Sequence, residues 1–141
     1  MENASRVMNG TWGQVWENGA EIVEVSAFQA KVSKNFDTLN LCGQMAEDRK
    51  LTGVKITGSM TLHKVYTRGA GDIEDAMRGK DVRKTLTGKL DDPDAYGAER
   101  IALYGVSYDE QTVMDWAAAK AGSLTIPFTA TGVEFLDKVE A

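Results

Sequence analysis

Apolar and polar side chains alternate at every second position along much of the chain, which is the pattern of half-buried β-strands. The alternation is clearest over residues 54–63, and strand patterns recur over 82–90, 101–106 and 122–129. Pro127 lacks a backbone N–H donor, so we expect the last of these strands to lie at a sheet edge or to end near that residue.

An Asn18-Gly19 pair separates two apolar runs, at 11–16 and 21–25. This pair is a strong local signal for a β-hairpin, because a type I′ turn requires positive φ at both central residues. The extended pattern then continues over 27–32.

Residues 72–78 depart from the strand pattern and predict one short helix. Asp72 can cap its start, and Gly79 is suited to end it. Three apolar side chains recur at helical spacing and are expected to seal one end of the core. They are Ile73, Ala76 and Met77.

Residues 40–52 follow neither pattern and predict a long hairpin loop between two strands. Loops of this length in compact domains are often functional. The order of strands, one helix and further strands predicts an α+β protein that is mainly β, built as a sandwich or barrel. No repeat or linker is visible, so we expect a single domain over residues 1–141.

Composition narrows the function classes only slightly. The chain has 16 Lys+Arg and 21 Asp+Glu residues, a net charge of −5, which argues against wrapping nucleic acid. No apolar run approaches the roughly 20 residues of a membrane span, and no signal-peptide pattern is visible. A lone cysteine fits a reducing compartment and, with a lone histidine, excludes Cys/His zinc sites. A compact monomer of this mass would expose about 7,000 Å².

Candidates for chemistry are weak. Cys42 and His63 could serve as nucleophile and base, but their spacing and the lack of an orienting group favour two unrelated residues. The carboxylates of Asp91, Asp92 and Asp94 could bind calcium, but the Asp-Pro step between them favours a turn.

Two further features have ordinary structural explanations. Gly69 and Gly71 precede the predicted helix, yet no phosphate-loop lysine follows them. The tryptophans could stack on bases or sugars, but packing in the core or at a subunit interface is favoured for Trp12, Trp16 and Trp116. The sequence therefore predicts no catalytic residue, no metal and no cofactor, and it favours an assembly protein over an enzyme.

Several stretches resemble the tail tube proteins of contractile phage tails, nearest to the defective-prophage and R-type bacteriocin (diffocin-like) tube subunits. The most specific stretch runs from Leu90 to Ile101 and contains Asp-Asp-Pro-Asp-Ala-Tyr-Gly-Ala-Glu-Arg. The resemblance covers nearly the whole chain in order. The other matching stretches are 9–16, 28–31, 43–45, 58–63, 127–129 and 135–137.

The resemblance implies a β-sandwich or barrel with one helix and a projecting hairpin. It implies hexameric rings that stack into a hollow tube inside a contractile sheath, with tape-measure, baseplate and tail terminator proteins as further partners. Such a tube penetrates the bacterial envelope and conducts DNA in a phage or ions in a bacteriocin. The subunit would be part of the particle and would assemble in the bacterial cytoplasm.

Within this picture we expect the loop to make ring-to-ring contacts and the polar strand faces to line the bore. The helix could also contact the sheath. The net negative charge either repels passing DNA or serves only solubility. The loop residues are Cys42, Gly43, Gln44, Met45, Ala46, Glu47, Asp48, Arg49 and Lys50, and the bore residues are Lys55, Thr57, Ser59, Thr61, Ser123 and Thr125.

Two alternatives remain at this point. One is a baseplate tube initiator or a secretion-system ring protein of the same fold. The other, more remote, is a monomeric carbohydrate-binding β-sandwich that uses its tryptophans.

Overall fold

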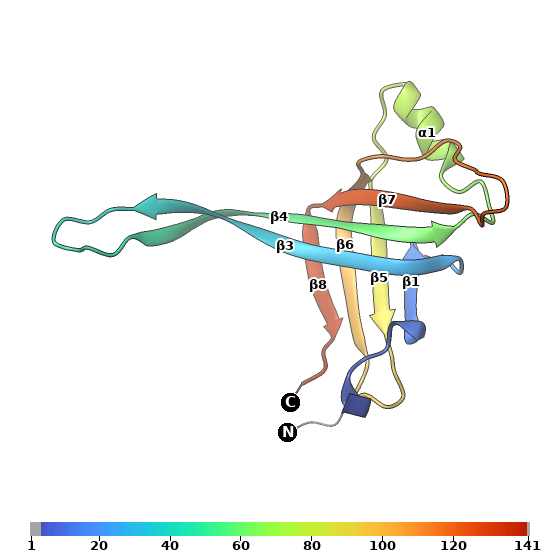
Figure 1. Cartoon of the computed structure of the whole chain (residues 1–141). Helices are drawn as coiled ribbons and strands as arrows, with labels where there is room; N and C mark the ends of the chain where they lie inside the picture. Colours follow the sequence, from blue (N-terminus) through green and yellow to red (C-terminus); the bar gives the residue numbers. More distant parts are fainter. Residues whose placement is uncertain (1–3, 141) are drawn as a thin grey trace.

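The computed structural model describes residues 4–140, and β-strands dominate it (Figure 1). One α-helix, α1 (Ala70–Met77), and two short 3₁₀ turns, η1 (Ala4–Arg6) and η2 (Gly10–Trp12), accompany the strands. The expected mainly β class with one short helix is therefore confirmed. The strands are β1 (Gly13–Glu17), β2 (Ala20–Glu21), β3 (Val25–Leu39), β4 (Asp48–His63), β5 (Lys84–Leu90), β6 (Glu99–Tyr108), β7 (Ser123–Ala130) and β8 (Gly132–Asp137).

The strands follow one antiparallel path, β2-β1-β5-β6-β7-β4-β3, with β8 paired to β6. In Figure 1 the strands β3, β4 and β7 run across β1, β5, β6 and β8, so the path folds into two layers. We call these the β4 layer (β3, β4, β7) and the β5 layer (β1, β2, β5, β6, β8). Strand β6 joins the layers, because it pairs with β5 and β8 and, at Ser107 and Tyr108, with β7.

The predicted turn at Asn18-Gly19 is confirmed, with φ of 50° and 86° at the two residues. The Asn18 side chain also accepts a hydrogen bond of 2.9 Å from the Thr85 N–H, which ties the hairpin to β5. The second strand is shorter than predicted, because β2 ends at Glu21 and Ile22 enters the core at 1% exposure.

Strand β4 builds the core through its alternation. Ile56, Met60 and Leu62 are buried, at 7%, 1% and 2% exposure, while the residues between them are not. β4 pairs with β3 on one side and with β7 on the other, and β7 adds buried Ile126 and Phe128 to the same face. The strand prediction for 54–63 is therefore confirmed, and β4 also extends beyond it to Asp48.

Two clusters of buried side chains fill the space between the layers, and Phe28 contacts both. Its ring stacks on Phe128 with centroids 5.8 Å apart. The remaining buried members come from both layers: Val15, Ile22, Leu86, Leu103, Val106, Ile126 and Ala130, with Ile56, Met60 and Leu62 of β4.

The position of β7 agrees with the prediction at Pro127. β4 pairs along one side of β7, whereas β6 pairs only with Phe128 and Thr129 on the other side, so that edge is open at Pro127. Pro127 lies one residue beyond the last β6–β7 pair, at Phe128, and its carbonyl accepts from the Asp109 N–H at 2.8 Å. The missing donor thus falls where pairing with β6 stops.

The helix differs from the prediction. Its N-cap is Gly69 with φ of 80°, and Asp72 lies in the first turn without a capping hydrogen bond. Gly79 takes the expected positive φ of 82° just after the helix. The expected core contacts of Ala76 and Met77 are wrong, since both are exposed and Met77 is 85% exposed, and Ile73 is only partly buried.

The chain exposes 10011 Å², against about 7,000 Å² for a compact monomer of its mass. Figure 1 shows the main reason, which is the β3–β4 hairpin projecting far beyond the two layers. The protomer therefore presents more surface than a self-contained domain of this size.

We predict that Gly58→Ala lowers the free energy of unfolding by at least about 2 kcal/mol, because it overpacks the core. A Cβ atom at Gly58 would lie 2.6 Å from the Phe128 ring and would also meet the Gln29 carbonyl. Urea unfolding measures the effect. Gly71→Ala in α1 is the control, because its Cβ meets nothing within 4 Å and the change should stabilise by roughly 1 kcal/mol. Equal stability of Gly58→Ala and wild type would contradict the close β4–β7 packing.

Candidate functional site

One face of the β4 layer is polar from strand to strand. Thr61 stands opposite Ala27 of β3 and Thr125 of β7, and the two threonine hydroxyls are 3.4 Å apart. Alternate residues of paired strands share a face, and none of the side chains on this face is buried. This polar face consists of Ala27, Gln29, Lys31 and Ser33; Lys55, Thr57, Ser59, Thr61 and His63; and Ser123, Thr125, Pro127 and Thr129.

The six residues expected to line a bore all lie on this polar face. Its fixed charges are cationic, because Lys31 and Lys55 project from neighbouring strands and neither has an ion-pair partner among residues 4–140. One carboxylate of the described chain contacts a side chain of this face: Asp109 accepts a hydrogen bond of 3.0 Å from the Thr129 hydroxyl. The sign of the face is thus opposite to that of the whole chain.

The projecting hairpin is longer than the sequence indicates, and its loop is shorter. Leu39 still pairs with Asp48, so residues 40–47 alone connect the strands. The loop predicted over 40–52 is wrong from Asp48 onward, because Asp48, Arg49 and Lys50 belong to β4. Every residue from 31 to 52 is exposed.

The hairpin carries an exposed apolar row that sequence reasoning missed, and the Arg49 guanidinium lies over its Phe36 ring, 3.9 Å from the centroid. Phe36 stands opposite Leu51, and the row continues the core-facing side of β3 and β4 through Val32 and Val54. These four side chains are 38–56% exposed. The sequence carries no clear signal for this row, because Lys34 interrupts the alternation between Val32 and Phe36, and the predicted strand stopped at residue 32. Such a row favours association with another apolar surface.

Helix α1 has no buried residue and is held to the protomer by charge. Asp72 forms an ion pair with Lys84, whose side chain is 4% exposed and lies over the Tyr108 ring, 4.6 Å from its centroid. The Tyr108 hydroxyl donates to Glu17 at 3.1 Å. Burial, reinforced by the Glu17 charge, raises the pKa of Tyr108 well above its usual value, so the phenol stays protonated.

A second ion pair anchors the segment that leads into the helix. Arg68 donates to both carboxylate oxygens of Glu24, one of them at 3.0 Å, and the Glu24 side chain is 4% exposed. Burial alone would raise the pKa of Glu24, but the hydrogen bonds and charge of Arg68, with a backbone hydrogen bond, outweigh burial and lower the pKa.

The candidate nucleophile and base are far apart. Cys42 is exposed in the hairpin loop, and His63 ends β4 at the opposite end of the strand. The 16 residues of β4 separate them by roughly 50 Å at strand rise. They form no catalytic pair in this structure.

The candidate calcium site is a turn. The buried Asp92 carboxylate accepts from the backbone N–H groups of Asn9 and Asp94, both at 2.9 Å. Within residues 4–140, no group of three or more His, Cys, Asp or Glu side chains could hold a metal ion. No helix in the same part of the chain is long and apolar enough to cross a membrane.

The tryptophans come from three separate places: η2, β1 and the β6–β7 loop. Trp12 and Trp116 are 49% and 78% exposed, so core packing does not account for either of them. Gly69 and Gly71 line a hollow beside Glu17 and Asp72, whose carboxylates oppose phosphate binding.

A family model described as "Phage tail tube protein" matches residues 1–137. A protein of Bacillus subtilis (strain 168), "Phage-like element PBSX protein XkdM", is 29% identical over 139 residues. The match covers 96% of this chain and 95% of that protein.

Two solved structures share the fold. The sheath-tube complex of an extracellular contractile injection system (PVC), in its extended state, matches with a TM-score of 0.68 at 10% identity. The match covers 96% of this chain and 98% of that chain. The six-fold symmetrised baseplate of the anti-feeding prophage matches with a TM-score of 0.59 at 7% identity, over 88% and 90% of the two chains.

We predict that Arg68→Met lowers the free energy of unfolding by about 2–3 kcal/mol at pH 7, because it strands the buried Glu24 carboxylate. The pKa of Glu24 is lowered on folding, so the pair stabilises above the unfolded pKa near 4.5, and this contribution is lost as the pH falls. The difference in the free energy of unfolding between Arg68→Met and wild type should therefore become smaller below about pH 4.5.

The control is Arg78→Met, which removes an exposed pair with Asp75 and should cost at most about 0.5 kcal/mol. Chemical unfolding at pH 7 and at pH 4 measures both variants. If Arg68→Met lowers the free energy of unfolding by the same amount at both pH values, the effect does not come from the Glu24 carboxylate.

Proposed function

The chain belongs to the phage tail tube protein family, and from this premise we propose that it is the repeating subunit of the inner tube of a contractile tail. The observation that carries the proposal is the two-sided β4 layer. One side is buried against the β5 layer, while the other is polar and has no buried side chain. A sheet with these two sides can form the wall of a water-filled tube.

The free edges of the β4 layer support closure into a ring. β3 pairs only with β4, and β6 covers only the last part of the outer edge of β7. Exposed edges invite pairing with another chain, and joining the β3 edge of one protomer to the β7 edge of the next leaves none free. Such a contact uses different surfaces on the two partners and closes as a cyclic ring. By analogy with the six-fold baseplate, we propose six subunits.

We propose that the polar face lines the bore of this ring. The bore would then present hydroxyl groups together with Lys31 and Lys55, rather than the carboxylates suggested by the net charge. Two lysines from each subunit would attract phosphates in a salt-dependent way. A repelling bore is therefore not part of the proposal.

We propose that the projecting hairpin reaches into the adjacent ring. Its apolar row of Val32, Phe36, Leu51 and Val54 is 38–56% exposed, with only the Arg49 guanidinium lying over the Phe36 ring, and its loop adds Met45, which is fully exposed. Burying that row against the next ring would connect successive rings without changing the closure of either one.

The remaining partners follow from the family and stay at the same level of proposal. The sheath would surround the tube, as in the PVC complex, with baseplate and terminator proteins at its ends and a tape-measure protein inside. DNA or ions would pass through the bore. The role is structural rather than enzymatic, and rings would assemble in the bacterial cytoplasm before the particle leaves the cell.

We predict that replacing residues 36–52 with Asn-Gly abolishes long tubes but leaves a folded protomer. The change closes the hairpin between Asn35 and Gly53, which pair in the register, and it removes only exposed residues. Circular dichroism checks the fold, and negative-stain electron microscopy counts rings and tubes.

A matched variant keeps the length of the hairpin and replaces residues 41–47 with glycine and serine. If the loop side chains make the contact, this variant also fails to stack, whereas normal stacking assigns the contact to the apolar row. Wild-type tube lengths from the shortened hairpin would refute ring-to-ring contact by this segment.

We predict that a cysteine on the polar face is shielded from large reagents in assembled tubes. In a Cys42→Ala background, Ser59→Cys should react with a small maleimide in both states. It should react with a maleimide attached to a globular protein only before assembly. Met77→Cys on the exposed side of α1 is the control and should react with both reagents in both states, in the absence of sheath. Reaction of the Ser59→Cys tube with the large reagent would exclude a bore position.

A further inference from the structure

The loop between β6 and β7 carries the most exposed tryptophan of the described chain. Val113, Met114 and Trp116 are 74%, 76% and 78% exposed within four positions. The far end of the loop is fixed, because the Lys64 N–H donates to the Gly122 carbonyl at 2.9 Å. Ala119 has φ of 58°, a left-handed conformation that costs a non-glycine residue about 1–2 kcal/mol. An apolar loop held in a strained shape indicates a binding role.

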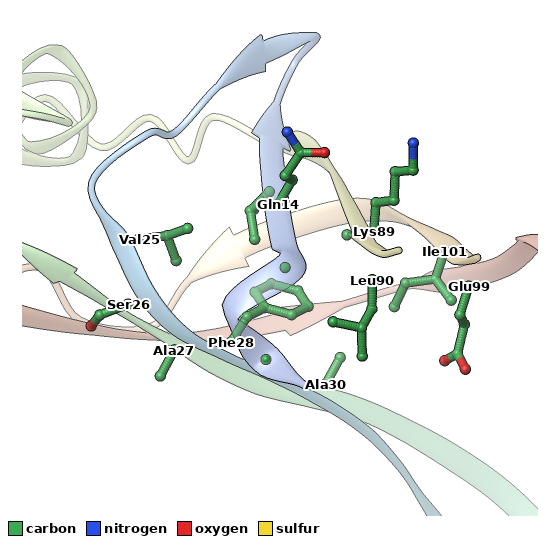
Figure 2. A pocket seen from close by; sticks show the side chains of 14 residues that line it. Gln14, Val25, Ser26, Ala27, Phe28, Ala30, Lys89, Leu90, Glu99 and Ile101 are labelled. Carbon is green, nitrogen blue, oxygen red and sulfur yellow. The ribbon is translucent and has the colours of Figure 1, made fainter. Parts of the chain in front are cut away.

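An apolar groove lies on the other side of the β4 layer, where the start of β3 passes over β1, β5 and β6. Its volume is about 510 Å³, within the range of sites that accept ligands. Figure 2 shows Phe28, Leu90 and Ile101 directed into it. Gly13 and Gly88 also line the groove, and because they have no side chains the backbone itself forms that part of the wall. No side chain of residues 4–140 fills this space.

The register brings loop and groove to the same level of the β4 layer, on opposite edges. Thr61 of β4 pairs with Ala27, in the groove-lining part of β3, and with Thr125, just after the loop enters β7 at Ser123. In a ring that joins the β7 edge of one protomer to the β3 edge of the next, the loop of the first therefore lies beside the groove of the second.

We propose that Trp116 of one protomer inserts into the groove of its neighbour in the ring, and this rests on the proposed tube function. A tryptophan buries 150–250 Å² and is among the residues that most often anchor an interface. The two surfaces are different, as a head-to-tail ring requires. The contact anchors the ring laterally, so its role differs from that of the hairpin, which connects successive rings.

The charges around the two surfaces are complementary. Lys89 and Glu99 border the groove on the neighbouring strands β5 and β6, and the Lys89 ammonium also lies 3.7 Å from the Asp91 carboxylate in a partly exposed ion pair. Asp115 directly precedes Trp116, and Lys120 follows four residues later. The loop therefore carries one charge of each sign opposite a rim with one charge of each sign, which favours one orientation of the inserted loop. The alanines at 117–119 leave room for close approach of the backbones.

Cross-linking tests the contact on assembled wild-type-length chains. In a Cys42→Ala background, Asp115→Cys is combined with Lys89→Cys, and the assembled tubes are treated with a mild oxidant. Disulfides between neighbouring protomers should then give a ladder of covalent oligomers on a non-reducing gel, and the ladder should end at the hexamer. Met45→Cys combined with Lys89→Cys is the comparison, because the hairpin loop is the rival occupant of the groove. A ladder from the Met45 pair, or tubes that form without a ladder from the Asp115 pair, would overturn the proposal.

Trp116→Ala provides the second readout. It should raise the protein concentration needed for ring formation by at least about tenfold while the circular dichroism spectrum stays unchanged. The blue shift of tryptophan fluorescence on assembly should also become smaller, because Trp12 and Trp16 remain. Met77→Ala, which removes an equally exposed apolar side chain, should assemble normally. Wild-type assembly of Trp116→Ala would refute the anchor, whereas failure of the wild-type chain itself to form rings would refute the proposed function and the contact with it.

Discussion

The two-sided register of β4 is the constraint on which the rest of the structure depends. Met60 must face the core while Thr61 faces away, and β4 imposes this choice on β3 and β7 because it pairs with both. A slip of one residue would move the whole apolar set to the polar face, so the burial of Ile56, Met60 and Leu62 fixes the register. The lengths of β3 and β4 then create the hairpin, because the two strands stay paired as far as Leu39 and Asp48, whereas β7 ends its pairing at Ile56.

Three incompletely covered apolar surfaces share one physical origin. The row around Phe36, the groove around Phe28 and the loop at Trp116 all arise where one layer extends past the other or where a connection leaves the core. A chain that exposes 10011 Å², against about 7,000 Å² for a compact monomer, has not completed its burial as a monomer. In the proposed ring, assembly would finish the hydrophobic core that folding begins.

The sequence alone predicts an element correctly where local chemistry decides its structure. Alternation located β4, β5, β6 and β7, and Asn18-Gly19 located the first turn, because positive φ and two-residue periodicity are local properties. Helix α1 was found, but its contacts were wrong, since an apolar stripe cannot reveal that Lys84 and Asp72 hold the helix instead. The true ends of the hairpin were missed because strand pairing past residue 32 depends on the partner strand. The groove combines β1, β3, β5 and β6 and has no signature within any one segment.

Charge shows the same dependence on tertiary structure. The chain has a net charge of −5, yet the face proposed to line the bore carries Lys31 and Lys55, neither of which has an ion-pair partner among residues 4–140. Acidic side chains are instead used around α1, where Glu24, Asp72 and Asp75 pair with Arg68, Lys84 and Arg78. Net charge therefore describes the solubility of the protomer, while the field inside a ring depends on the few side chains that the β4 register directs inward. A bore with repeated lysines would hold an anionic polymer weakly and release it as ionic strength rises, so its transport properties follow from register rather than from composition.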